Sequence, residues 1–128
     1  MTTDYANDLW RRARQALRSA EVLLSVSADD AASRAYYAAF HAVSALFAAQ
    51  GRTFVRHTAL RAAVHRDLVH TCIWPAALGE TFDALWELRD TGDYGGAMHV
   101  SADDATAAVA AARSILAVIA EARGWSCD

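Results

Sequence analysis

The sequence contains no lysine, a single proline (Pro75) and only two cysteines (Cys72 and Cys127). One proline in 128 residues, with 55% hydrophobic residues of which many are alanine, argues against a strand-rich fold and favours helices. The two cysteines form no paired-cysteine motif and suggest a reducing compartment. The composition therefore predicts an all-α protein, and the length fits a single domain that covers residues 1–128.

Long hydrophobic runs and a basic net charge are also missing. We expect charged residues to interrupt every apolar stretch before it reaches the ~20 residues that a bilayer span requires. The first residues lack the basic and then apolar order of a signal peptide, so a cytoplasmic protein without a membrane partner is expected. The formal net charge of −3 argues against general affinity for phosphate backbones, and no DNA partner is expected.

All twelve basic residues are arginine, and most of them fall into two groups, within residues 11–18 and 52–66. The planar guanidinium group of arginine matches the geometry of a phosphate better than the point charge of lysine does. Two explanations stay open. The arginines serve anion binding, or a genome rich in G and C encodes arginine and alanine in preference to lysine.

The spacing of apolar residues predicts five helices, at about residues 4–24, 29–50, 58–70, 75–89 and 101–123. Ser27 with Asp30, and Ser101 with Asp104, resemble capping boxes at the starts of the second and fifth helices. The simplest assembly is an up-and-down antiparallel bundle of four to five helices.

Glycines mark the expected helix ends. Gly51, Gly92 and Gly124 each follow an apolar periodic stretch, where a C-terminal glycine stops a helix. With Gly95 and Gly96, the segment from residue 91 to residue 100 is expected to be irregular.

Arg34 and His41 lie seven residues apart in the second expected helix, so their side chains project roughly 20° apart. The same side carries Tyr37 and small residues such as Ala38 and Ala45, which let another backbone come close. We therefore predict a helix with two buried faces, and a seam between two copies of the chain on the Arg34 side. A buried guanidinium needs a counter-charge, which an anionic ligand would supply. In the alternative, Arg34 reaches solvent and His41 forms a hydrogen bond inside the bundle.

A second candidate segment covers residues 87–95. Arg89 offers a phosphate ligand, Asp90 and Asp93 offer carboxylates that orient it, and Tyr94 offers a phenol. The alternative is that these polar groups only cap the helix and bind water.

The third candidate segment is the start of the third helix, where Arg56 and His57 lie beside free backbone N–H groups that attract anions. A simple N-terminal cap is the alternative. His65 and His70 lack a zinc-binding spacing, and neither a phosphate-binding glycine loop nor a nucleophile elbow occurs. No metal and no cofactor are expected.

Three segments in this order resemble the HEPN family, in particular its small stand-alone bacterial and archaeal members. They are Ser-Arg-Ala-Tyr-Tyr-Ala-Ala-Phe-His-Ala (33–42), Arg-His-Thr (56–58) and Leu-Arg-Asp-Thr-Gly-Asp-Tyr-Gly (88–95). The resemblance extends over about residues 5–122. It implies a helical bundle that dimerises around the second and fourth helices.

Many HEPN proteins are metal-independent endoribonucleases, whose arginine and histidine are separated by four to six residues and meet their copies across the dimer. Arg34 and His41, with six residues between them, satisfy this spacing. Family ribonucleases usually carry the motif late in the chain, where this sequence has Arg89 and, in place of the histidine, Tyr94. The resemblance also implies a minimal nucleotidyltransferase partner, an antitoxin that adenylates a tyrosine near the motif; Tyr94 is the candidate acceptor.

The leading hypothesis is the toxin of a toxin–antitoxin pair, a homodimer that cuts RNA. Its candidate catalytic residues are Arg34, His41 and Arg89, and the candidate supporting residues are Tyr37, Arg56, His57, Asp90 and Asp93. The alternative is a non-catalytic subunit that binds a nucleotide or another anion and docks a minimal nucleotidyltransferase. A third hypothesis is a structural helical dimer without a ligand.

Overall fold

The computed structural model describes residues 2–127, and these residues form helices without any strand. The prediction of an all-α helical bundle is therefore confirmed. The elements are α1 (Thr2–Leu23), α2 (Ala28–Ala48), α3 (His57–Ala63), the π-helix η1 (Val64–Val69), α4 (Ala76–Tyr94) and α5 (Ala102–Arg123).

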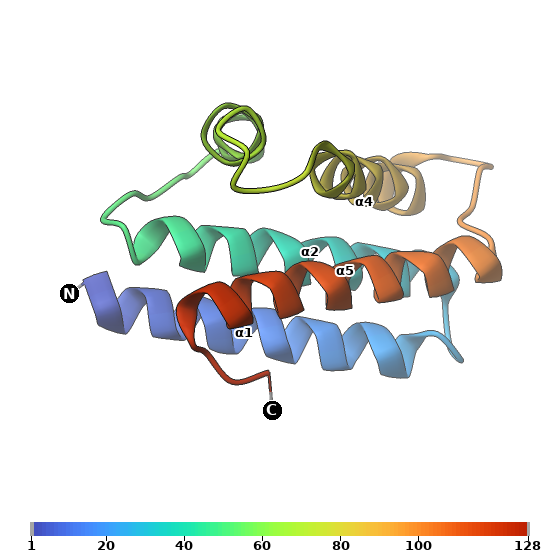
Figure 1. Ribbon diagram of the computed structural model, residues 1–128. Helices are drawn as coiled ribbons and strands as arrows, with labels where there is room; N and C mark the ends of the chain where they lie inside the picture. The colour runs from blue at the N-terminus through green and yellow to red at the C-terminus, as the bar shows by residue number, and fades with distance from the viewer. Residues whose placement is uncertain (1, 128) are drawn as a thin grey trace.

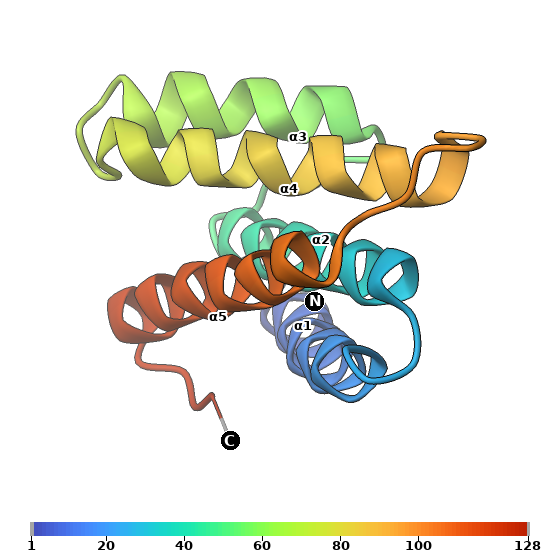
Figure 2. The same ribbon diagram turned by 90° about the vertical axis from the view of Figure 1, so that its right-hand side faces the viewer.

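Helix α2 lies at the centre of the bundle, in contact with α1, α4 and α5. In Figure 1, α1, α2 and α5 run lengthwise next to one another, whereas α4 is seen almost end-on. Figure 2, turned by 90°, shows α3 and α4 lengthwise and side by side. The α3–η1–α4 hairpin therefore crosses the layer formed by α1, α2 and α5 at a steep angle.

Both predicted N-terminal caps are present. The side-chain oxygen of Ser27 accepts a hydrogen bond from the backbone N–H of Asp30, and Ser101 does the same for Asp104. Such a bond satisfies one of the free N–H groups in the first helical turn. At the far end of α5, Gly124 adopts the left-handed conformation (φ +70°) that stops the helix.

The predicted end of the fourth helix at Gly92 is wrong, because α4 continues to Tyr94 and ends at Gly95. A glycine at position 92 has a role other than ending the helix. A Cβ atom at this position would lie 3.0 Å from the backbone oxygen of Asp29, at the start of α2. The glycine allows α4 to approach α2 closely. Because α4 continues to Tyr94, Asp90 and Asp93 lie on this helix, as Arg89 does, and not on a loop.

The third helical stretch covers nearly the predicted residues, but only its first half is α-helical. From Val64 to Val69 it is a π-helix, in which backbone hydrogen bonds span five residues; the N–H of His70 donates to the carbonyl of His65 at 2.9 Å. Leu60 and Leu68 are buried. The periodicity of the apolar residues did not predict the π-helix, because the residues that face the core are the same as those expected for an α-helix.

Helix α2 has two buried faces, as predicted. Tyr36 and Phe47 are buried in the aromatic part of the core, and the alanine side is equally inaccessible, with Ala38 and Ala45 fully buried. Helix α1 makes the most extensive contact with α2 and covers this side within the chain. The alanine stripe therefore does not require a second copy to bury it, contrary to the expectation of a seam there.

Helix α5 corrects the expectation that no segment is long and apolar enough to cross a bilayer. Among the described residues it is the one helix that meets this test by length and composition. Its apolar residues, including Ala112, Ile115 and Ile119, are buried against the bundle. A core helix of a globular bundle passes the same test, so the observation is weak evidence for a membrane span.

Replacement of Gly92 by valine tests the close approach of α4 to α2. Gly92→Val should lower the free energy of unfolding by ~1–3 kcal/mol, because the side chain overlaps the backbone of Asp29. Ala77→Val, at an exposed position of α4, is the control without the overlap; valine has a lower helix propensity than alanine but a higher one than glycine, so propensity alone would destabilise only this control. Urea denaturation followed by circular dichroism measures both. A Gly92→Val variant at least as stable as the unmodified protein would contradict the close approach.

Candidate functional site

A polar pocket of about 270 Å³ lies between α1 and α2. Helix α2 contributes Arg34 and His41, which the sequence placed on one line of the helix. The rest of the pocket wall comes from α1 and consists of Arg12, Gln15, Ala16 and Ser19. The structure thus brings the predicted arginine and histidine to a common cavity within a single chain.

Arg34 has no acidic partner in this pocket. Its guanidinium carbon lies 4.9 Å from the centre of the Tyr37 ring, and within residues 2–127 no carboxylate forms an ion pair with it. Arg12, the second arginine of the pocket, is neutralised in part by Asp8 at 3.1 Å. The pocket therefore carries excess positive charge, which suits an anionic ligand.

His41 is half-buried, and its Nδ1 atom is buried without a hydrogen-bond partner. The predicted alternative, a histidine hydrogen-bonded inside the bundle, is therefore not observed. Burial lowers the pKa of His41 below its usual value, and the positive charges of Arg12 and Arg34 lower it further. At neutral pH the imidazole is uncharged and able to accept a proton.

Arg89 of α4 lies on the other side of Tyr37 and is held tightly, with only 12% of its side chain exposed. Its Nη2 donates a hydrogen bond to the Tyr37 hydroxyl at 2.8 Å, and its Nε lies 3.1 Å from a carboxylate oxygen of Asp93. Aromatic rings surround the guanidinium at 5.4–5.9 Å, namely those of Tyr36, Tyr37, Trp86 and Tyr94. The group is a structural anchor that has little room for a ligand.

Tyr37 joins the two candidate segments. Arg34 packs over one face of the Tyr37 ring, and Arg89 donates a hydrogen bond to the Tyr37 hydroxyl. Both arginines therefore contact the same side chain. The ring also lies 6.1 Å from that of His41, centre to centre. The segments around Arg34 and Arg89 therefore meet within one chain at Tyr37, which does not itself line the pocket but supports Arg34, which does.

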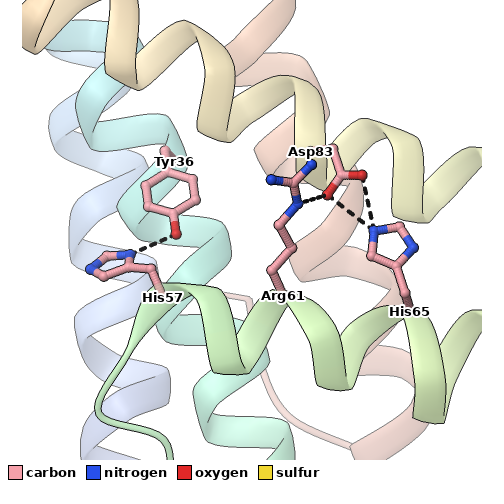
Figure 3. A network of polar contacts seen from close by, with 5 residues as sticks. All are labelled: Tyr36, His57, Arg61, His65 and Asp83. Carbon is pink, nitrogen blue, oxygen red and sulfur yellow. Dashed lines mark hydrogen bonds and ion pairs between the residues drawn. The ribbon is translucent and has the colours of Figure 1, made fainter.

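His57 belongs to an aromatic cluster behind this wall. Its Nδ1 is hydrogen-bonded to the hydroxyl of Tyr36 at 2.7 Å, as Figure 3 shows, and its ring stacks on Phe40 at 4.2 Å. Burial lowers the pKa of His57, with a further contribution from the charge of Arg89, and burial also raises the pKa of Tyr36 well above its usual value. Both groups are neutral at pH 7. His57 therefore packs the core and does not line the pocket.

A second polar network in Figure 3 ties α3 and η1 to α4. Asp83 lies 2.7 Å from Nε of Arg61 and 2.9 Å from Nε2 of His65. Burial acts to raise the pKa of Asp83, but the hydrogen bonds from Arg61 and His65 outweigh it and lower the pKa. The network fixes how the hairpin packs, and with it the position of Arg89 on the same helix.

Three other candidates lie apart from the pocket. Arg56 and Asp90 are exposed, and neither forms an ion pair with any residue of the described part of the chain. Tyr94 is 70% exposed at the end of α4, with its ring 5.4 Å from the guanidinium carbon of Arg89. Of these, Tyr94 offers a free hydroxyl to a partner, next to a positive charge.

The contribution of α1 to the pocket was not predicted from the sequence. Arg12, Gln15 and Ser19 follow one another at three- and four-residue spacing, as residues on one face of a helix do. This polar stripe borders the apolar face of α1. It could have been found by treating the arginine group as part of a surface that adjoins α2.

Taken together, fold and pocket define a helical bundle with a cationic, histidine-containing pocket beside an aromatic cluster. Residues 6–122 match the family model of the HEPN domain, and the chain therefore belongs to the HEPN family. The resemblance drawn from the sequence is thus confirmed, and the family supports a role related to nucleotides or RNA.

Two relatives agree with this assignment. The chain is 41% identical over 90 residues to a UPF0332 protein from Thermotoga maritima, covering 69% of this chain and 68% of the relative. In structure it is similar to TT1696 from Thermus thermophilus, with a TM-score of 0.77 and 27% identity. That match covers 91% of this chain and 96% of the other.

The lowered pKa values of His41 and His57 predict how stability depends on pH. Below about pH 6.5 the unfolded chain takes up protons at both histidines while the folded protein resists protonation, so stability should fall as pH decreases from about 7 to about 5.5. His41→Gln should flatten this dependence, and His70→Gln, at an exposed position, should not. Urea unfolding at several pH values measures the slope. An unchanged slope in His41→Gln would contradict the neutral, buried state of His41.

Proposed function

We propose that this HEPN protein is a metal-independent endoribonuclease whose active centre is the pocket of Arg34 and His41. One observation supports this most directly. An arginine without an acidic partner and an uncharged imidazole line the same cavity. Cleavage of RNA needs these two groups, a cation for the phosphate and a base for the 2′-hydroxyl.

In the proposed reaction, Nε2 of His41 accepts the proton of a ribose 2′-hydroxyl as its oxygen attacks the adjacent phosphorus. The bond from phosphorus to the 5′-oxygen breaks, and that oxygen takes a proton from a water molecule as it leaves. The products are a 2′,3′-cyclic phosphate and a 5′-hydroxyl end. Arg34 stabilises the negative charge that builds up on the phosphate oxygens, with Arg12 as a second cation.

The burial of Arg89 favours the Arg34 pocket as the active centre over residues 87–95, here called the late segment. Arg89 is nearly enclosed and already bound to Tyr37 and Asp93. We assign it the role of positioning Tyr37, which in turn supports Arg34. We further propose, from the family resemblance, a cytoplasmic homodimer that acts as the toxin of a toxin–antitoxin pair.

The His41→Ala variant tests the proposed base. It should cut single-stranded RNA at least a hundredfold more slowly, since general acid–base catalysis is typically worth ~10² to 10⁴ in rate. His70→Ala, at an exposed position on another element, should cleave like the unmodified protein. Single-turnover assays in excess chelator, scored for 2′,3′-cyclic phosphate ends, measure the rates. Unchanged cleavage by His41→Ala would remove this residue from the mechanism.

The two arginines distinguish the pocket from the late segment in the same assay. Arg34→Ala should lose cleavage without losing stability, whereas Arg89→Ala should mainly lower the free energy of unfolding. Loss of cleavage in a folded Arg89→Ala variant, with Arg34→Ala fully active, would instead place the active centre at the late segment.

The exposure of Tyr94 favours a second candidate function. In this version the protein is a non-catalytic subunit that binds a nucleotide or another anion and presents it to a minimal nucleotidyltransferase, with Tyr94 as the group that is modified. RNA that stays intact after incubation with the protein would favour this candidate.

Replacement of Tyr94 tests the modification. Incubation with a minimal nucleotidyltransferase and with ATP labelled at the α-phosphate should label the chain, as the phenol oxygen attacks the α-phosphorus and pyrophosphate leaves. Tyr94→Phe should abolish labelling, while Tyr5→Phe, at another exposed tyrosine, should retain it. Mass spectrometry locates the adenylate. Labelling that persists in Tyr94→Phe would exclude Tyr94 as the acceptor.

A further inference from the structure

The Arg34–His41 pocket does not end at Ser19. A second hollow, of about 500 Å³, lies next to it on α1 and is lined by Gln15, Arg18, Ser19, Val22 and Leu23. Gln15 and Ser19 line both hollows. The two hollows therefore adjoin along one face of α1, and this surface from Arg12 to Leu23 is here called the α1 groove.

The two ends of the α1 groove differ in chemistry. One end carries Arg12, Arg34 and His41, and the other end is mainly apolar, with Val22 68% exposed and Leu23 half-buried. A ligand that suits both ends has a phosphate at one end and an uncharged, flat group at the other. Nucleotides have this composition.

Arg18 adds a second cation at the apolar end. Within the described part of the chain it forms no ion pair, and no carboxylate lines either hollow. Asp8 pairs with Arg12 and so reduces the charge of that lining residue, whereas Glu21 pairs with Arg113 of α5 at 2.6 Å and not with Arg18. The groove therefore presents positive charge at two separate points.

The middle of the groove has unused hydrogen-bonding groups. The side chains of Gln15 and Ser19 form no hydrogen bond with other described residues, although both lie between the two charged ends. An amide and a hydroxyl can each donate and accept, as the edge of a nucleobase does. From Arg12 to Val22, α1 rises by about 15 Å, and about four stacked nucleotides at ~3.4 Å each cover this distance.

We propose that the α1 groove binds the single-stranded RNA next to the phosphate that is cleaved. The next phosphate along the strand binds Arg18, its base packs on Val22 and Leu23, and Gln15 and Ser19 contact the base edge. This inference rests on the proposed ribonuclease function and adds a binding subsite to it. Single-stranded RNA fits because its charges are spaced along a line and its bases are exposed.

Binding measurements with Arg18→Ala test the phosphate contact. The probe is a single-stranded RNA of about ten nucleotides with 2′-fluoro sugars, which His41 cannot activate. Affinity should fall about fivefold, and the slope of log K against log salt concentration should decrease by about 0.7, as expected for one lost phosphate contact. Arg123→Ala, at the far end of α5, should change neither quantity.

Val22→Asp tests the base contact. It should weaken binding of the same RNA about tenfold, because it removes apolar contact and places a carboxylate beside a phosphate. Val26→Asp is the matched control, since Val26 is 72% exposed and does not line the groove. In cleavage assays of unmodified RNA, the loss in Val22→Asp should be larger for the longer RNA than for a dinucleoside monophosphate, which contains only one phosphate.

The outcomes separate this inference from the proposed function. If His41→Ala abolishes cleavage while Arg18→Ala and Val22→Asp bind RNA normally, the subsite is wrong and the ribonuclease remains. If the unmodified protein neither binds nor cuts RNA, both are wrong. If Val22→Asp leaves RNA binding intact but changes the oligomeric state in sedimentation, the groove is a contact between copies of the chain, which also overturns the inference.

Discussion

The close packing of α2 between its neighbours is the constraint on which the rest of the structure depends. A helix in contact with α1, α4 and α5 has little surface left for large side chains, and the core of α2 is accordingly rich in alanine. Small residues bring the helix axes close together, so groups at the border of each contact are brought near one another. The Arg34–His41 pocket lies at such a border, where α1 and α2 meet.

Electrostatics in this pocket follow from the same packing. His41 is too buried to be charged easily, and the arginines beside it raise the cost of a further positive charge. Arg34 has an aromatic ring beneath it but no carboxylate. An anion in the pocket would stabilise both groups, because it would neutralise the charge of Arg34 and favour protonation of His41. The pocket is thus suited to a negatively charged ligand, whether that ligand is cleaved or only bound.

Tyr37 shows how the fold connects two parts of the sequence that are 52 residues apart. Its ring supports Arg34 and its hydroxyl holds Arg89, so the late segment is linked to the pocket only through Tyr37 and Arg34. The position of Arg89 depends in turn on the length of α4, which continues past Gly92. Sequence patterns suggested a helix end there because glycine commonly stops helices, but at this position glycine allows contact with Asp29. The two uses of glycine cannot be distinguished without the neighbouring helix.

The sequence by itself determined the helical class, the capped starts of α2 and α5, the two buried faces of α2 and the family. All of these depend on local composition, on the 3.6-residue period or on short motifs. Only the tertiary structure decided that α1 covers the alanine side of α2, that His57 packs the core, and that Arg12, Gln15 and Ser19 join Arg34 and His41. The physical reason is that helix periodicity states which residues share a face but not which other helix packs against it. The candidate site forms where α1 packs against α2.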